Sequence, residues 1–455
     1  MMTGKDLVLG VMRHEDVERA PWVPFAGVHA GKLKGYSAEE VLKDGDKLFE
    51  SLMEVNKMYT PDGQPVLFDL QIEAEILGCK LLWAEKNPPS VATHPLANTE
   101  EIPTKEITKT DGRIPMLLDV CQRMKVAVGE NTALYGLFCG PFTLASHLRG
   151  TQIFMDMVDA PEKMQALMEY TTKISKNMID FYLETGMDII APVDPLISQI
   201  SPKHFEQYMA KPYSELFTYI REKGAFSSFF VCGNAYRNIR GMCKTNPDAI
   251  SIDENIPMAK AKAITDLYNI TLGGNIPLST TMLFGNQQDN MKVVVDMVDS
   301  LDNTKNLIIA PGCDMPYDIP FENAIAVAET VKDLATYREL VKNYATVDES
   351  IEVELPDYAH LTKPLIEAFT LDSVSCAACT YLWEVVKDAK MKYGDKIDIA
   401  ERKYAYKEGI ARCRKIGVQQ LPSLYINGEL KYSSIIPSQE ELYAEIEKTI
   451  KLIAG

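Results

Sequence analysis

The sequence predicts an α/β protein in which a (β/α)8 TIM-type barrel is followed by a smaller α/β domain. Three observations lead to this prediction. Over residues 1–342, short apolar runs alternate with longer segments of helical period. An acidic stretch at residues 343–357 interrupts the alternation, and residues 358–455 then resume it with a different order of elements. At roughly 150 residues per domain, a chain of 455 residues has room for two or three domains.

The barrel prediction depends on six apolar runs. Each run has the length of a strand, is rich in β-branched or aromatic residues, and is followed by a helix candidate. The runs are residues 132–139, 187–193, 226–232, 249–253, 270–276 and 306–312, and the clearest helical patterns are at 141–150, 202–223, 235–244 and 321–337. So many repeats favour a closed barrel over an open sheet.

The stretch 343–357 is predicted to be a solvated linker. Within residues 347–357, five of eleven residues are acidic and none is basic, and Pro356 lies near the end. The elements expected after it are strands at 365–371, 397–400, 421–426 and 430–436 and helices around Leu382–Ala389, at 406–416 and at 439–452. Asn427-Gly428 supplies the positive φ angles of a tight hairpin between the last two strands.

A Cys-Ala-Ala-Cys motif lies where the first of these strands passes into a helix. Its first sulfur, on Cys376, faces the free N–H groups and the positive end of the helix dipole, which favour a thiolate. The segment resembles thioredoxin-like proteins, and Pro422 occupies the place of their cis-proline. The resemblance implies that Cys376 is the attacking thiol and Cys379 the resolving thiol. The alternatives are a degenerate docking domain or two cysteines that contribute to a metal site.

Composition excludes several classes of partner. The chain has 47 Lys and Arg against 64 Asp and Glu, a net charge of −17, so it offers no basic field for nucleic acid or for an anionic membrane surface. It has no run of about 18 apolar residues, and charges interrupt its N-terminus, so a cytoplasmic protein is expected. The nine scattered cysteines do not form a secreted disulfide framework.

Several phrases of the first 342 residues resemble the uroporphyrinogen decarboxylase superfamily, in particular its methyltransferase branch. That branch contains methylcobamide:coenzyme M methyltransferases and corrinoid-dependent O-demethylation enzymes. The matching phrases are FDLQIEAEILGC (68–79), GLFCGPFTLASHLRG (136–150), DPLISQISPKHF (194–205), FVCGNAYRNI (230–239), LGGNIP (272–277) and PGCDMPYDIPFENAIA (311–326). The resemblance implies the barrel fold and a corrinoid-linked methyltransferase.

The decarboxylases of the superfamily carry an arginine-rich segment after the first strand, because a substrate with several carboxylates needs bidentate cationic partners. The corresponding residues here, 23–31, contain no arginine, and Cys313 stands where the late loop of the decarboxylases offers a histidine. Porphyrinogen decarboxylation is therefore the second reading. A third is a redox or metal-handling protein whose barrel binds a ligand without turning it over.

The methyltransferase branch binds zinc through an H-x-C motif and a later lone cysteine, and the zinc presents a thiolate for methyl transfer. By this resemblance Cys232 and Cys313 are the two cysteine ligands, but Phe230 replaces the histidine. His29, Glu73, His147 and Asp194 are substitute ligands by residue type, and His29 is preferred because it follows the first expected strand. Any one of them is otherwise an ordinary hydrogen-bonded residue.

Other residues are predicted to line the same pocket. Asp69 and Asp194 are the expected catalytic carboxylates by resemblance, with helix capping or a supporting hydrogen bond to another site residue as the alternative for each. Phe230, Glu73, Cys139 and His147 are expected to contact substrate, because they stand near strand ends or within the matching phrases. Asp253, in SIDEN, is a further acidic candidate.

The chain lacks the D-x-H-x-x-G signature of corrinoid binding. Methylcobamide is therefore expected to arrive as a substrate, free or on a corrinoid protein, and to exchange its methyl group with a small acceptor or donor. Two cysteines that share a zinc in relatives lie close enough to form a disulfide without it. We therefore hypothesise that the C-x-x-C motif, recharged by a thiol reductant, reduces a Cys232–Cys313 disulfide or accepts electrons from the barrel.

Overall fold

A computed structural model describes residues 2–345, 351–374 and 376–454. The chain divides into two compact units, Met1–Thr346 and Val347–Gly455. The division falls inside the linker predicted at 343–357, of which residues 346–350 lie outside the described residues. Across the described ranges, no helix combines the length and the apolar character needed to cross a membrane.

The first unit is built on a parallel sheet of seven strands in the order β1-β4-β5-β6-β7-β8-β9. The six predicted runs are confirmed as β4 to β9. The strands of this sheet are β1 (Gly63–Pro65), β4 (Ala133–Cys139), β5 (Ile189–Val193), β6 (Phe226–Val231), β7 (Ala249–Ile252), β8 (Thr271–Ile276) and β9 (Leu307–Pro311). A separate antiparallel pair consists of β2 (Leu81–Leu82) and β3 (Ser90–Val91).

The sheet curls so that one further backbone segment lies between its two edge strands. Trp22 forms a parallel bridge with Ile309 of β9, and Ile309 N donates to Pro21 O at 2.9 Å. On its other side, Trp22 O accepts from the amide of Asp62 at 2.9 Å, just before β1. The arrangement is consistent with a TIM-type barrel. The Trp22 segment is the strand expected before His29, whereas β1 is too short to form an apolar run, which is why pattern alone did not reveal it.

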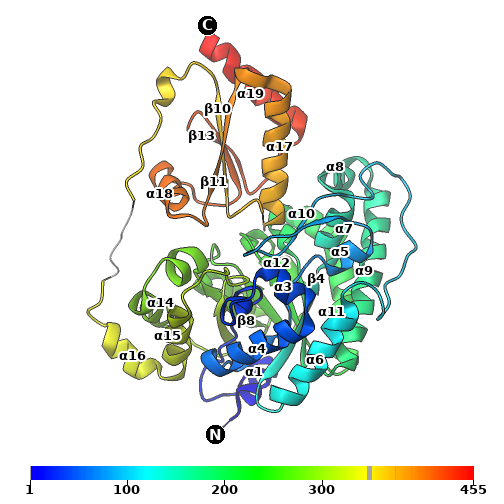
Figure 1. Ribbon diagram of the computed structural model, residues 1–455, viewed down its shortest axis with the longest axis vertical. Helices are drawn as coiled ribbons and strands as arrows, with labels where there is room; N and C mark the ends of the chain where they lie inside the picture. Colours follow the sequence, from blue (N-terminus) through cyan, green and yellow to red (C-terminus); the bar gives the residue numbers. More distant parts are fainter. Residues whose placement is uncertain (1, 346–350, 375, 455) are drawn as a thin grey trace. The chain divides into compact units, whose positions relative to one another are not determined.

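Helices lie outside the curled sheet of the first unit (Figure 1). They are α1 (Gly4–Met12), α2 (His29–Lys32), α3 (Ala38–Lys43), α4 (Gly45–Tyr59), α5 (Ile72–Ile76), α6 (Ile114–Val128), α7 (Pro141–Arg149), α8 (Gln152–Asp159), α9 (Pro161–Glu184), α10 (Pro202–His204), α11 (Ala210–Glu222), α12 (Ile239–Lys244), α13 (Met258–Leu267), α14 (Gln287–Asp299), α15 (Phe321–Lys332) and α16 (Leu334–Val341). Shorter 3-10 or π segments are η1 (Pro195–Gln199), η2 (Phe205–Met209), η3 (Tyr236–Asn238) and η4 (Leu278–Leu283). Buried strand residues such as Tyr135, Phe230 and Ile308 fill the interior.

The second unit has a sheet of four strands in the order β11-β10-β12-β13, in which only the β10–β11 pair is parallel. The elements expected from the sequence are present in the expected order. They are η5 (Tyr358–His360), β10 (Leu365–Thr370), α17 (Ala377–Tyr393), η6 (Gly394–Lys396), β11 (Asp398–Lys403), α18 (Lys407–Ile416), β12 (Ser423–Ile426), β13 (Glu429–Ser433) and α19 (Gln439–Ala454). Asn427 and Gly428 adopt φ angles of 50° and 78° at the hairpin, and the Leu421–Pro422 peptide bond is cis.

Candidate functional site

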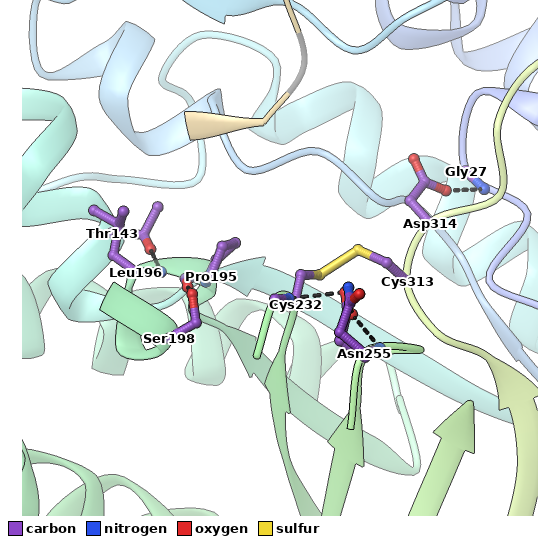
Figure 2. The surroundings of a disulfide bond; sticks show 11 residues. Gly27, Thr143, Pro195, Leu196, Ser198, Cys232, Asn255, Cys313 and Asp314 are labelled. Atoms are coloured by element: carbon purple, nitrogen blue, oxygen red, sulfur yellow. Dashed lines mark hydrogen bonds between the residues drawn. A yellow bond between two sulfur atoms is a disulfide. The ribbon is translucent and has the colours of Figure 1, made fainter. Parts of the chain in front are cut away.

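Cys232 and Cys313 lie together at the carboxyl ends of two barrel strands. Cys232 directly follows β6, and Cys313 lies two residues beyond β9. Their sulfurs form a disulfide with a Cα–Cα distance of 5.9 Å (Figure 2). Both residues are partly exposed and pack against the interior cluster of the barrel. The carboxyl ends of the strands are where barrel enzymes place their active sites, and we call the loops around this disulfide the barrel mouth.

Two carboxyl groups, on the buried Asp253 and the partly buried Asp314, hold the loops that carry the cysteines. Asp253 accepts from Gly233 N at 2.8 Å, and Asp314 accepts from Gly27 N at 2.9 Å, the latter contact visible in Figure 2. Burial raises the pKa of both carboxyl groups, and these hydrogen bonds only partly offset it. Gly233 has a φ of 80°, and a Cβ on Gly27 would lie 2.5 Å from Asp314 Oδ1. Both glycines are therefore required by this geometry.

Glu254 adds a further acidic group to the mouth. Its side chain accepts from the amide of Leu278, and its burial, followed by the charge of Asp253, raises its pKa to about 8. Sequence reasoning missed both Glu254 and Asp314. The available signal was their position, because each directly follows a residue at a strand end that had been singled out, Asp253 and Cys313.

Phe230 contributes an apolar ring where the resemblance calls for a nitrogen ligand. The ring is buried, and its centroid lies 4.7 Å from that of Phe25 and 5.6 Å from that of Phe68. These rings belong to the interior cluster against which Cys232 packs. Phe230 thus forms part of an aromatic floor, and it offers no metal ligand.

His29, the predicted replacement ligand, has both ring nitrogens engaged in hydrogen bonds, which does not favour a role as a metal ligand. Its Nδ1 lies 3.0 Å from Tyr317 O, and its Nε2 lies 2.7 Å from Tyr59 Oη. Because a carbonyl oxygen only accepts, Nδ1 carries the proton and Nε2 accepts from the tyrosine. Burial lowers the pKa of His29 to about 4, so the ring is neutral and both nitrogens are engaged.

The donor set does not fit a zinc ion. Both candidate thiols are consumed by the disulfide, Phe230 has no donor atom, and both nitrogens of His29 are occupied. Within residues 2–345, 351–374 and 376–454, no group of three His, Cys, Asp or Glu side chains is placed to hold a metal ion. A catalytic zinc site needs three protein ligands, so no step is assigned to zinc here.

Asp194 has the capping role that the sequence left as the alternative. Its carboxylate accepts from the amides of Phe142 and Thr143 at 2.9 and 3.1 Å, in the first turn of α7, and from Thr143 Oγ1 at 2.6 Å and the hydroxyl of Tyr213. Burial raises its pKa to about 6 despite these bonds. With both oxygens occupied, Asp194 holds the start of α7 against the end of β5.

Asp69 forms a buried ion pair with Arg113, a residue that sequence reasoning missed. The Asp69 side chain is fully buried, and it also accepts from Gln71 N at 2.8 Å. Arg113 lies 44 positions away in sequence and also donates to Glu75 at 2.9 Å. No local pattern indicates such a pair. The arrangement favours a structural role for Asp69, while its predicted catalytic role remains a prediction.

Glu73 and Cys139 are brought together behind the mouth. Cys139 N donates to Glu73 Oε1 at 3.0 Å, whereas Glu73 Oε2 is buried without a hydrogen-bond partner in the described part of the chain. Burial raises the pKa of Glu73 to about 8. Burial, and then the charge of Glu73, raises the pKa of the Cys139 thiol well above its usual value. At pH 7 Glu73 is therefore a neutral acid with one free oxygen.

His147, on α7, is buried with neither ring nitrogen hydrogen-bonded to any described residue. Burial lowers its pKa to about 3, so the imidazole is neutral. Its carbonyl oxygen accepts from Cys79 Sγ at 3.3 Å and from the Nδ1 of His94 at 2.8 Å. Contact of His147, Glu73 or Cys139 with a substrate remains a prediction.

The uroporphyrinogen decarboxylase (URO-D) family matches residues 3–334, which contain every barrel residue discussed above. The chain belongs to this family. It is 25% identical over 342 residues to the methylcobamide:CoM methyltransferase MtbA of Methanosarcina acetivorans, covering 73% of this chain and 98% of that protein. It is 26% identical over 303 residues to the uroporphyrinogen decarboxylase of Wolbachia sp. subsp. Brugia malayi, covering 64% and 83%.

A solved structure supports the fold of the first unit. A methyltransferase from Methanosarcina mazei superposes with a TM-score of 0.67 at 20% identity, over 73% of this chain and 99% of that one. The aligned 73% of this chain is about the length of the first unit. The family match ends at residue 334, so the second unit lies outside it.

The second unit of this URO-D family chain carries the Cys376–Cys379 motif at the start of α17. Cys376 is the N-cap residue, and its sulfur accepts from Cys379 N at 3.4 Å. Cys379 is buried, its sulfur accepts from Leu371 N at 3.3 Å, and burial together with the hydrogen bond to Cys376 raises its pKa well above the usual value. The first sulfur is thus the accessible one, and the second remains a protonated thiol.

Proposed function

We propose that the barrel transfers a methyl group between a corrinoid and a thiol or another small acceptor. The observation that carries the proposal is the position of Cys232 and Cys313 at the ends of β6 and β9, which matches the two cysteines of the methyltransferase branch. A methylcobamide:CoM methyltransferase that aligns over 98% of its own length supports it. The corrinoid is a substrate, free or delivered by a corrinoid protein.

The absence of arginine from the first loop argues against uroporphyrinogen decarboxylation as the alternative. Residues 23–31 are buried and contain no arginine. The loops next to the cysteines instead carry Asp253, Glu254 and Asp314. A substrate with several carboxylates would find no guanidinium group in the first loop, which disfavours its binding.

The proposed reaction requires the cysteines in their reduced form, because a disulfide offers no thiolate. The acceptor, in its thiolate form, attacks the methyl carbon. The new sulfur–carbon bond forms as the carbon–cobalt bond breaks, and the electron pair of the broken carbon–cobalt bond stays with cobalt. The acceptor must first lose its proton. That proton passes to the solvent.

We further propose that residues 358–455 form a thioredoxin-like redox unit in which Cys376 attacks and Cys379 resolves. Three features support this proposal. The half-exposed Cys376 caps a helix of 17 residues, Cys379 is buried beneath it, and the Leu421–Pro422 bond is cis just before β12. Titration of the motif in redox buffers, followed by alkylation and mass spectrometry, would test it.

Methylcobalamin demethylation by the reduced protein, followed by absorbance with a panel of thiols, tests the barrel proposal. We expect activity with at least one thiol and its loss in Cys232→Ser and Cys313→Ser. Cys243→Ser, which changes a buried free cysteine of the same unit, is the matched control and should keep activity. Inactivity with every thiol, together with release of CO₂ from uroporphyrinogen, would overturn the proposal in favour of the decarboxylase.

A further inference from the structure

The cysteines of the chain differ sharply in exposure. Six of the nine are buried: Cys79, Cys121, Cys139, Cys243, Cys379 and Cys413. The three that solvent reaches are the two partners of the barrel disulfide and Cys376. A thiol exchanges with a disulfide only when both are accessible. Among the accessible sulfurs, Cys376 is therefore the potential attacking thiol and the Cys232–Cys313 disulfide is its potential target.

We infer that the Cys232–Cys313 disulfide is the substrate of the Cys376–Cys379 dithiol. The chain then supplies the reductant of its own barrel cysteines, within one molecule or between two copies. This inference rests on the redox function proposed for the second unit, and it names the target of that unit.

The barrel disulfide is suited to reversible opening. It joins two loops rather than two strands, and each loop is anchored independently of the sulfur–sulfur bond. Gly233, next to Cys232, donates to Asp253, and Asp314, next to Cys313, accepts from Gly27. These hydrogen bonds hold the backbone on both sides when the bond opens. The reduced sulfurs therefore stay at the mouth, where the methyl-transfer reaction needs them.

Of the C-x-x-C pair, Cys376 is placed to attack first and Cys379 to act second. Cys376 is half-exposed at the helix start, where the Cys379 amide donates to its sulfur. Cys379 is buried and receives a hydrogen bond from Leu371 N, so it cannot reach an outside disulfide first. It lies one turn of helix from Cys376 and is placed to resolve a mixed disulfide formed there.

The exchange balances in two steps. The Cys376 thiolate attacks one barrel sulfur, a mixed disulfide forms, and the other barrel cysteine leaves as a thiolate that takes up a proton. Cys379 then loses its proton and attacks Cys376, which releases the second barrel thiol and leaves a Cys376–Cys379 disulfide. Two electrons have passed from the second unit to the barrel. An external small dithiol or a dithiol protein restores the Cys376–Cys379 pair.

The test uses the full chain with a Cys379→Ser substitution, which removes the resolving thiol. After purification without reductant and blocking of free thiols, peptide mapping should show Cys376 linked to Cys232 or Cys313. In the wild type at limiting dithiothreitol, the barrel disulfide should be reduced at least about tenfold faster than in Cys376→Ser. Cys413→Ser, which alters a buried cysteine of the same unit, should behave like the wild type.

Absence of the mixed disulfide together with equal reduction rates in wild type and Cys376→Ser would overturn the inference. The redox titration of the motif separates this result from failure of the proposed redox unit. A Cys376–Cys379 pair that cycles normally while the barrel disulfide stays oxidised refutes only the assignment of its target. A pair that never forms a disulfide refutes the redox unit itself and the inference with it.

Discussion

Glu73 links the stability of the barrel to pH, and a Glu73→Gln substitution would isolate this link. Burial raises the pKa of Glu73 from its ordinary value of 4.5 to about 8. Between these two values the folded state binds a proton that the unfolded state has released, so stability falls as pH rises. The slope for one group is about 1.4 kcal/mol per pH unit. From pH 5.5 to 7.5 the carboxyl group therefore lowers the free energy of unfolding by about 2.5 kcal/mol, a loss that glutamine cannot show.

The assay is urea unfolding at pH 5.5 and 7.5, followed by tryptophan fluorescence, in which Trp22 reports on the barrel because it is fully buried there. Glutamine keeps the acceptor for Cys139 N, and any constant cost of its unpaired amide cancels between the two pH values. The stability of Glu73→Gln relative to the wild type should rise by about 2.5 kcal/mol from pH 5.5 to pH 7.5. Glu101→Gln, at an exposed position, is the control. Equal pH dependence of Glu73→Gln and the wild type would refute the reasoning.

Two further predictions concern the barrel cysteines. Cys232 and Cys313 are 81 positions apart in sequence. Their disulfide lowers the entropy of the unfolded chain and so stabilises the folded state by about 4.5 kcal/mol. Reduction should therefore lower the urea midpoint. Cys232→Ser should show the lower midpoint with or without reductant, and a wild-type midpoint indifferent to reductant would contradict the estimate. Metal analysis of the reduced protein should find well below one zinc per chain, because Phe230 and His29 supply no ligand. A stoichiometric zinc that is lost in Cys232→Ser would show that the reduced loops recruit another donor.

The strand ends were the part of the site that could be predicted from sequence. Strands β4 to β9 are continuous apolar runs because a parallel sheet is buried on both faces, so their ends are visible in the pattern. Cys232 and Cys313 follow two of these ends, and their closeness was expected from the resemblance to relatives in which the two cysteines share a zinc ion. Strand β1, Gly63–Pro65, escaped detection because its short sequence contains no β-branched residue.

The roles of His29, Asp69 and Asp194 depended on partners that sequence spacing does not reveal. His29 meets a carbonyl oxygen 288 positions away, and Asp194 meets helix amides 51 and 52 positions away. Each of these side chains looks like a ligand or a catalyst when considered alone. Only the contact decides whether its hydrogen-bonding capacity is already used.

The sequence by itself determined the alternation of strands and helices, the acidic break before the second unit, the placement of two cysteines at strand ends and the C-x-x-C motif at a helix start. These features follow from periodicity and neighbouring residues, which are local properties of the chain. The tertiary structure alone decided that His29 and Asp194 are occupied and that burial leaves Glu73 a neutral acid. These outcomes depend on the distance between distant segments and on the loss of water around each group, and the fold sets both.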